Sequence, residues 1–464
     1  MKAANRATGT EMVIFGASGD LTKRKILPAI ESLRVRSELP AGFQVVGAGR
    51  SAQTTEQFRE IAGPEAEWCR LDYADPASYA ELKKLVGSSK TAIFYLATPP
   101  ATFSSIINSL AVAGLIRKGD ASRRVVLEKP LGQDAVSSGR IDRDLAAALD
   151  EPQVFRIDHY LAKDTVQNTL AFRFSNSVFE PIWNRTLIES IQLTAAEEEG
   201  IGKRAGYYDQ IGAIRDVVQN HVLQVLALVT MEPPTSFDPA AIRTAKLEAL
   251  RAMQPIDAGE AVRGQYLGYL DEAGVSAGSR RETYAAARIV MDNWRWDGVP
   301  IYIRAGKALR RRATEVVIRF RDAPHLRIGG RRHRGIPTLL VIRIQPQEGI
   351  TLRIGAKLPG ARFEMVPAGM SLEYARLSRS PLPDAYEHVL REILAGGHSV
   401  FPSGSEIIRS WEIVDPLVAT WEQDGHPEPY ARGSWGPGGA EELVAATGGG
   451  RWLNPGEEPG TTTD

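Results

Sequence analysis

The sequence has a single cysteine, no net charge and no long uninterrupted run of apolar residues. Cys69 alone cannot form an intramolecular disulfide or a cysteine-based zinc site, and it suits a reducing compartment. Lys and Arg together number 56, as do Asp and Glu, so the whole chain does not attract nucleic acid or an anionic membrane surface. The opening MKAANRATGTEMVIF has no apolar signal core. These absences predict a cytoplasmic protein without a membrane or nucleic-acid partner.

Length and composition indicate a globular protein of ordinary type. With 464 residues, the chain exceeds the size at which one hydrophobic core stops growing, so two sizeable domains are expected. The fractions of hydrophobic residues (43%) and charged residues (24%) are typical of globular proteins. Because the net charge is zero, any anion site must be local.

The order of strand-like and helix-like segments changes along the chain. Near the start, MVIFG, FQVVGAG, AIFYLA and RVVLEKP alternate with longer helical segments, which predicts βαβ units on a parallel sheet. Beyond Arg288, TEVVIRF, TLLVIRI and ITLRIGAK follow one another with few helices between them, which predicts a large antiparallel sheet. We therefore expect an α/β domain with a doubly wound, Rossmann-type sheet over 1–155 and an α+β domain over 156–464.

Two further segments have distinct patterns. From Asp209 to Thr230, apolar residues recur at helical spacing, which predicts one buried helix with polar groups on one side. The last thirty or so residues are rich in glycine and acidic groups, and we expect them to include a loosely ordered tail.

A glycine-rich turn follows the first predicted strand. Backbone amides of such a turn, at the start of a helix, can bind a pyrophosphate. The spacing departs from GxGxxG, so a plain tight turn is the competing interpretation. Its position after the first strand favours a nucleotide. The candidate residues are Gly16, Ala17, Ser18, Gly19, Asp20, Leu21, Thr22 and Lys23.

Arg50 ends the second predicted strand, where an NAD-binding protein usually has an acidic residue for the ribose hydroxyls. An arginine there suits a ribose 2′-phosphate and favours NADP, although a solvated arginine is also common at a strand end. Asp72 closes the next short segment and is a candidate neighbour of the adenine, although it is an ordinary loop residue otherwise.

Polar residues are dense in two further places. Lys129 ends a strand, and the run RIDHYLAK contains His159, Tyr160 and Lys163, which together could bind a substrate phosphate or form a surface salt-bridge cluster. Asp216 and His221 lie five residues apart on one predicted helix. A histidine there could accept a hydroxyl proton, with a satisfied core histidine as the alternative.

Motifs spread over nearly the whole chain resemble those of the glucose-6-phosphate dehydrogenases. RIDHYLxK together with the downstream QNH is highly specific, whereas the GASGDL turn alone is not. The matching segments are, in order, GASGDLTKRKILPAI, EKPLG, RIDHYLAKDTVQNTLAFRFSN, AGYYDQIGAIRDVVQNHVLQ, DNWRWDGVPIYIRAGKAL, IRIQPQEGI, DAYEHVL and GSWGP.

The resemblance implies a role for each candidate residue. His221 would be the general base and Asp158 the carboxylate that pairs with it, while Lys129 would serve both substrate and coenzyme. Residues 16–23, Arg50 and Asp72 would bind NADP. The implied substrate contacts are His159, Tyr160 and Lys163 for the phosphate, Glu197 and Asp216 for the sugar hydroxyls, and Lys307 and Arg312.

The resemblance also implies an activity and an assembly. The enzyme would oxidise glucose 6-phosphate at C1, the first step of the oxidative pentose phosphate pathway, with NADP as coenzyme and no metal. Its active site would lie in the cleft between the domains, and it would form a homodimer or homotetramer through the large sheet. Ala162, where the family usually has glycine, and Phe103, where some members have tyrosine, could change affinities. A dehydrogenase of another sugar phosphate and a catalytically silent NADP-binding regulatory paralogue are the alternative functions.

Overall fold

The chain forms two compact units in the computed structural model. The structure describes residues 9–86, 88–325, 327–328, 331–332, 335–360, 363–377, 383–423 and 425–456. Two segments discussed above lie partly outside these ranges. They are the opening of the chain, of which 1–8 are not described, and the glycine-rich end, of which 457–464 are not described. Unit 1 combines Met1–Ala162, Pro234–Thr244 and Pro383–Ile408, and unit 2 combines Lys163–Pro233, Ala245–Leu382 and Arg409–Asp464. The functional division into 1–155 and 156–464 stays a prediction.

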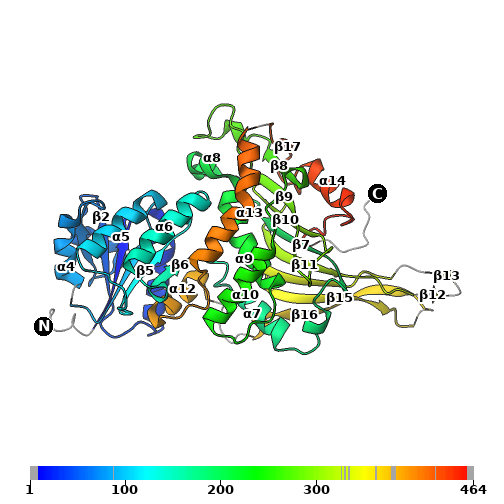
Figure 1. Cartoon of the computed structure of the whole chain (residues 1–464), viewed down its shortest axis with the longest axis horizontal. Helices are drawn as coiled ribbons and strands as arrows, with labels where there is room; N and C mark the ends of the chain where they lie inside the picture. Colours follow the sequence, from blue (N-terminus) through cyan, green and yellow to red (C-terminus); the bar gives the residue numbers. More distant parts are fainter. Residues whose placement is uncertain are drawn as a thin grey trace. The chain divides into compact units, whose positions relative to one another are not determined.

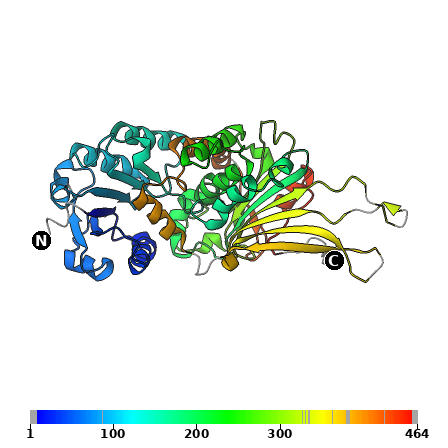
Figure 2. The same ribbon diagram turned by 90° about the horizontal axis from the view of Figure 1, so that it is seen from below.

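Unit 1 contains a parallel sheet of six strands in the order β3-β2-β1-β4-β5-β6. Figures 1 and 2 show helices on both faces of this sheet, with the dark blue α2 on one side and α5 and α6 on the other. Burial on both faces explains why the central strands are apolar along nearly their whole length. The strands are β1 (Thr10–Phe15), β2 (Gln44–Gly49), β3 (Glu67–Arg70), β4 (Thr91–Leu96), β5 (Arg123–Leu127) and β6 (Val154–Arg156).

The helices of unit 1 have identifiable start signals. Asp134 caps α6 by accepting the backbone N–H of Ser137 at 2.7 Å, and Thr54 caps α3 in the same way through Gln57. The helical segments are η1 (Thr22–Ile26), α2 (Leu27–Val35), α3 (Thr55–Ala62), η2 (Pro76–Tyr79), α4 (Ala80–Val86), η3 (Pro100–Thr102), α5 (Phe103–Val112), α6 (Ala135–Ala148), η4 (Glu151–Gln153) and α12 (Ala385–Ala395).

Unit 2 contains a sheet of nine strands in the order β16-β15-β14-β11-β7-β10-β9-β8-β17. Strand pairs β7–β10 and β8–β17 are parallel and the other neighbouring pairs are antiparallel. The two sheets confirm the predicted fold class. The strands are β7 (Ile188–Ala196), β8 (Ala261–Tyr266), β9 (Tyr284–Ile289), β10 (Ile301–Gly306), β11 (Ala313–Phe320), β14 (Leu339–Gln345), β15 (Gly349–Lys357), β16 (Met365–Glu373), β17 (Glu428–Tyr430) and the separate pair β12 (Arg327–Ile328) and β13 (Arg331–Arg332).

Helices of unit 2 pack on its sheet: η7 contacts β7 and β10, α7 contacts β14, and α14 contacts β8 and β9. In Figure 1, strand β15 extends beyond α7 and α9. Helices α10 (Pro239–Ala252) and α13 (Gly404–Gln423) begin in unit 1 and end in unit 2. The other helical segments are α7 (Asp164–Phe174), η5 (Glu180–Ile182), η6 (Gly202–Arg204), α8 (Ala205–Ala213), η7 (Ile214–Val222), α9 (Leu223–Thr230), η8 (Ala258–Glu260), η9 (Tyr269–Asp271), α11 (Tyr374–Leu377) and α14 (Gly438–Ala446).

One local expectation differs from the structure. The helix predicted from Asp209 to Thr230 is broken at Gly212, where φ is 76° and ψ is 177°, and it continues as the π-helix η7 and then as α9. These angles are open to glycine and not to residues with a side chain. Within the last thirty or so residues, α14 packs in the core and the Trp452 indole donates to Ala440 O at 2.8 Å. The expectation of a loosely ordered tail stays a prediction, because residues 457–464 lie outside the described ranges.

Candidate active site

The glycine-rich turn of unit 1 packs tightly between two strand ends. Gly16 has φ 78°, and its N–H donates to Ala48 O at 3.1 Å. A Cβ atom on Gly16 would lie 2.5 Å from Ala97 O, so only glycine fits. Gly16 O in turn accepts the N–H of Gly19 at 2.9 Å and the Thr22 hydroxyl at 3.3 Å. The turn is therefore closed by its own hydrogen bonds, directly before the helical segment that starts with η1.

The turn lies at the point where the strand order reverses. Strand β1 has β2 on one side and β4 on the other, and the order β3-β2-β1-β4-β5-β6 is that of dinucleotide-binding sheets. Ligands of such sheets bind outside the carboxyl ends of the strands at this reversal. Ala17 and Thr22 are buried, whereas Ser18, Gly19, Asp20 and Lys23 are exposed and Leu21 is intermediate. The residues present therefore fit a bound dinucleotide.

Arg50 and Asp72 follow the two strands on one side of the turn. The exposed guanidinium of Arg50 lies 5.6 Å from the centre of the Tyr73 ring. Burial raises the pKa of the Tyr73 hydroxyl, so it stays neutral beside Arg50. Asp72 accepts the N–H of Ala74 at 3.0 Å, which is an Asx turn. Arg50 is thus the cation that follows β2, as the sequence indicated.

Lys129 and the run containing Asp158 follow β5 and β6. Glu128, next to Lys129, is buried and accepts the Tyr95 hydroxyl at 2.6 Å, and burial raises the pKa of this carboxyl. The buried Asp158 accepts the N–H of Tyr160 at 2.9 Å. These contacts anchor both segments in unit 1.

The aromatic residues of this run lie together. The His159 ring is 5.1 Å from the Tyr160 ring and stacks on Tyr386 of α12 at 6.2 Å, measured between centroids. His159 is partly buried, and Tyr160 is 8% exposed. Aromatic contact with α12 therefore orients the imidazole.

In unit 2, the π-helix η7 carries Asp216 and His221. A π-helix hydrogen-bonds each residue to the one five positions further along, so these two residues lie one turn apart. Both are buried, at 8% and 2% exposure. In an α-helix the same spacing would separate the two side chains around the axis, since 3.6 residues make a turn. The π-helix therefore places Asp216 and His221 on one side of the helix axis.

Lys307 joins two of the predicted sugar-binding carboxylates. Its ammonium Nζ lies 2.5 Å from Glu197 Oε1 and 3.3 Å from Asp216 Oδ2, and it also lies over the Tyr208 ring. The Lys307 and Asp216 side chains are nearly buried, whereas that of Glu197 is 43% exposed. Lys307 follows β10, Glu197 follows β7 and Asp216 lies on η7. Three separate segments thus each contribute one charged group to a single polar cluster.

Lys163 and Arg312 converge on a residue that was not singled out from the sequence. Lys163 Nζ donates to Gln345 Oε1 at 2.9 Å, and Arg312 Nη2 reaches the same oxygen at 3.5 Å. Gln345 is held by its own amide, which donates to Thr314 Oγ1 at 2.9 Å. The signal for it was present, because Gln345 belongs to the family-like segment IRIQPQEGI. Two cations within reach of one amide form a site suited to an anion.

The described ranges contain neither a membrane-spanning helix nor a cluster of metal ligands. No helix in the part of the chain that the structure describes is long and apolar enough to cross a membrane. Likewise, among these residues no group of three or more His, Cys, Asp or Glu side chains is placed to hold a metal ion.

Comparison with known protein families matches both parts of the chain. The profile of the glucose-6-phosphate dehydrogenase NAD binding domain matches residues 13–67 and 64–168. The profile of the glucose-6-phosphate dehydrogenase C-terminal domain matches residues 170–453.

Individual relatives match over almost their full length. Glucose-6-phosphate 1-dehydrogenase 2 of Mycobacterium tuberculosis is 40% identical, with 96% of this chain and 94% of the relative covered. A solved glucose-6-phosphate dehydrogenase in complex with its substrate glucose-6-phosphate is 35% identical with a TM-score of 0.87, covering 96% of this chain and 98% of that one. The enzyme from Mycobacterium avium is 34% identical with a TM-score of 0.86, covering 97% and 100%. The chain therefore belongs to the glucose-6-phosphate dehydrogenase family.

Proposed function

We propose that this protein oxidises D-glucose 6-phosphate at C1 to 6-phosphogluconolactone and reduces NADP. The observation that carries the proposal is the polar arrangement in unit 2. Lys163 and Arg312 meet at Gln345 and are suited to a phosphate, while Lys307, between Glu197 and Asp216, is suited to sugar hydroxyls. A relative of the same fold is solved with glucose-6-phosphate, which agrees with this assignment.

In the proposed reaction His221 accepts the proton of the C1 hydroxyl. The coenzyme, when bound, supplies the acceptor for the C1 hydride. A neutral imidazole can take the hydroxyl proton as the C1–H bond breaks. Asp158 is the carboxylate proposed to pair with the resulting imidazolium. His159 and Tyr160 are proposed to bind the phosphate together with Lys163, and Lys129 to serve both ligands.

The proposed coenzyme site is the turn of residues 16–23 with Arg50 and Asp72. Backbone amides of this turn, at the start of a helical segment, can bind a pyrophosphate, and the exposed guanidinium of Arg50 suits a 2′-phosphate. We place the reaction in the cytoplasm, because the single cysteine, Cys69, is buried and fits a reducing compartment.

Direct measurement of NADP reduction with different sugar phosphates tests the proposed function. NADP reduction is followed at fixed enzyme concentration with glucose 6-phosphate and with a panel of other hexose phosphates. We expect the highest kcat/KM with glucose 6-phosphate. A higher value with another hexose phosphate would assign the enzyme to that sugar. Absence of turnover with every sugar, despite NADP binding, would favour the regulatory paralogue.

We also propose a homodimer or homotetramer built through the large sheet. Strand β16 is an edge strand of that sheet, and its Met370 and Leu372 are 57% and 40% exposed. Exposed apolar residues on a sheet edge favour association with another chain. Light scattering of the purified protein checks the proposal, since a monomer over the working concentration range would contradict it.

A further inference from the structure

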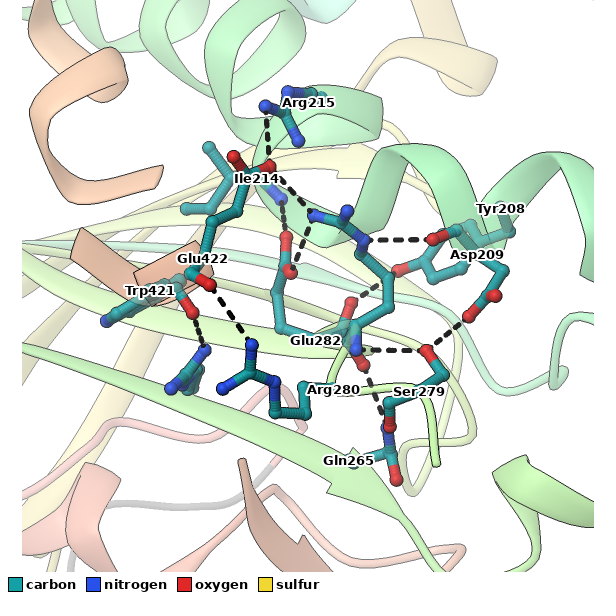
Figure 3. A network of polar contacts seen from close by, with 12 residues as sticks. Tyr208, Asp209, Ile214, Arg215, Gln265, Ser279, Arg280, Glu282, Trp421 and Glu422 are labelled. Atoms are coloured by element: carbon teal, nitrogen blue, oxygen red, sulfur yellow. Dashed lines mark hydrogen bonds and ion pairs between the residues drawn. The ribbon is translucent and has the colours of Figure 1, made fainter. Parts of the chain in front are cut away.

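The break between α8 and η7 is built around a buried carboxylate. A Cβ atom on Gly212 would lie 2.1 Å from Glu282 Oε1, so the carboxylate occupies the space beside the break. Glu282 is 4% exposed and lies two positions before the first residue of β9. Figure 3 shows its side chain pointing at Ile214, the first residue of the π-helix.

Glu282 supplies hydrogen-bond acceptors to two successive residues at the start of η7. Its backbone carbonyl accepts the N–H of Ala213 at 3.1 Å, and its Oε1 accepts the N–H of Ile214 at 3.3 Å. Ala213 is the N-cap residue and has no side chain able to do this. The first N–H groups of a helix need partners from outside, and negative charge is favourable at that end. Glu282 therefore caps η7 from a distant part of the chain.

The carboxylate is held in place by neighbouring charges. Arg281 Nη1 lies 3.7 Å from Glu282 Oε2. Arg281 Nε also donates, at 3.0 Å, to the backbone oxygen of Asp209, a residue of α8. Glu422 Oε1 lies 3.6 Å from Arg281 Nη1 and 3.0 Å from Arg215 Nη2. Burial raises the pKa of Glu282, and Arg281 opposes that shift. The network thus joins both sides of the break to one carboxylate.

Thr283, the residue after Glu282, contacts Lys307 of the proposed sugar-binding cluster, which consists of Lys307, Glu197 and Asp216. Thr283 O, next to Glu282, accepts the N–H of Lys307 at 2.9 Å. Lys307 Nζ in turn lies 3.3 Å from Asp216 Oδ2, and Asp216 is two residues beyond Ile214. A closed path therefore runs from Glu282 through Ile214 to Asp216 and back through Lys307 to Thr283.

We propose that Glu282 is a positioning residue for the sugar-binding cluster. By capping η7 beside Gly212, it sets the register at which Asp216 meets Lys307 and at which His221 follows one turn later. The inference rests on the proposed roles of Asp216 and His221 in sugar oxidation. Glu282 itself does not touch the substrate in this role.

The first test follows the helix without any substrate. Amide hydrogen exchange over residues 213–222 is measured by mass spectrometry for wild type, Glu282→Ala and Glu422→Ala. Glu422 is the matched control, because it shares Arg281 with Glu282 but, among the contacts described, accepts no backbone N–H of η7. We expect faster exchange over this segment in Glu282→Ala and unchanged exchange in Glu422→Ala. Unchanged exchange in Glu282→Ala would overturn the proposal, whatever reaction the enzyme catalyses.

The second test separates positioning from simple structural support. We expect Glu282→Ala to raise KM for glucose 6-phosphate about tenfold or more and to lower kcat, with KM for NADP within about twofold of wild type. Glu282→Gln keeps an oxygen acceptor for Ile214 and should restore KM to within about threefold. Faster exchange with unchanged KM and kcat would make Glu282 a structural residue only and would overturn the proposal.

A third comparison distinguishes this inference from the proposed function. If Glu282 acts through Asp216, Glu282→Ala should raise KM for the sugar less in an Asp216→Ala background than in wild type. Full additivity would overturn the proposal. An Asp216→Ala variant with unchanged KM would instead count against the proposed role of Asp216. Should Glu282→Ala fail to fold, Glu282→Asp, whose carboxylate is withdrawn by one methylene, replaces it with the same expectations in smaller degree.

Discussion

Lys307 and Asp216 form a nearly buried ion pair, with 3.3 Å between Nζ and Oδ2 and side-chain exposures of 8% and 9%. Removing one partner of such a pair leaves a buried charge without compensation, which typically costs about 3–5 kcal/mol. We therefore expect Lys307→Met to lower the free energy of unfolding by about that amount in urea titrations. The double variant Lys307→Met with Asp216→Asn should recover part of the loss. A single variant within about 0.5 kcal/mol of wild type would show that the pair does not stabilise the fold.

His221→Asn should abolish turnover with little change in substrate affinity. Asparagine keeps some hydrogen bonding but cannot accept the C1 hydroxyl proton, and loss of a general base typically lowers kcat on the order of a hundredfold or more. Asp158→Asn should lower kcat by a similar or smaller factor. Steady-state kinetics with glucose 6-phosphate checks both, and near-normal kcat in His221→Asn would remove it as the base.

Lys163→Ala should raise KM for glucose 6-phosphate far more than KM for free glucose. The structure places the ammonium on Gln345 Oε1, 2.9 Å away and beside Arg312, where a phosphate can replace the amide contact. Lys84→Ala is the matched control, because that lysine is exposed and pairs only with Glu81 within its helix among the contacts described. An equal effect of Lys163→Ala on both sugars would assign it to structural support.

Arg50→Ala should raise KM for NADP about tenfold or more and leave KM for NAD nearly unchanged. A guanidinium can donate charge-assisted hydrogen bonds to a 2′-phosphate, each worth roughly 1.5 to 3 kcal/mol, whereas about 1.4 kcal/mol corresponds to a tenfold change. Arg34→Ala, another exposed arginine of unit 1, is the control. Equal losses for both coenzymes would mean that Arg50 supports the Tyr73 contact rather than the phosphate.

His398 should make the protein less stable in mild acid. Its ring stacks on Phe155 at 4.3 Å between centroids, with Nε2 2.9 Å from Pro152 O and Nδ1 3.0 Å from Arg243 Nη2. A carbonyl only accepts and an arginine only donates, so the ring is neutral with its proton on Nε2. Burial, together with Arg243, lowers the pKa of His398 from 6.5 to about 4.

The direction of the pH effect follows from this shift. Between pH 6.5 and about 4 the unfolded chain binds a proton on His398 that the folded chain does not, so stability is full above pH 6.5 and is lost as pH falls. His398 contributes at most about 1.4 kcal/mol per pH unit to the slope of the unfolding free energy against pH. Denaturant titrations at several pH values across this range should show that the free energy of unfolding falls less steeply with falling pH in His398→Gln than in wild type. An equal pH dependence in the two proteins would contradict the prediction.

The sequence predicted the features that depend on neighbouring residues. The β-branched runs became β1, β2, β4 and β5, and TEVVIRF, TLLVIRI and ITLRIGAK became β11, β14 and β15. The turn at Gly16 was identified because a glycine directly after a strand favours a sharp change of chain direction. Local pattern and local geometry agreed in these places.

Features that depend on distant residues could not be predicted in the same way. The π-helix η7 begins where it does because Glu282, 68 positions beyond Ile214, accepts its first N–H. Gln345 became part of the candidate site only when folding brought it to Lys163, 182 positions away. Periodicity along the chain contains no information on such pairings.

Unit 1 is assembled from three stretches of chain, and the last of them ends at Ile408. Arg124 of β5 donates to Leu394 O at 2.8 Å, and Lys25 pairs with Asp384 at 3.1 Å. Because the ribosome synthesises the chain from its amino end, α12 can join unit 1 only after most of the polypeptide has been made. A gene fragment that stops at residue 162 would therefore lack two of the three stretches that make up unit 1.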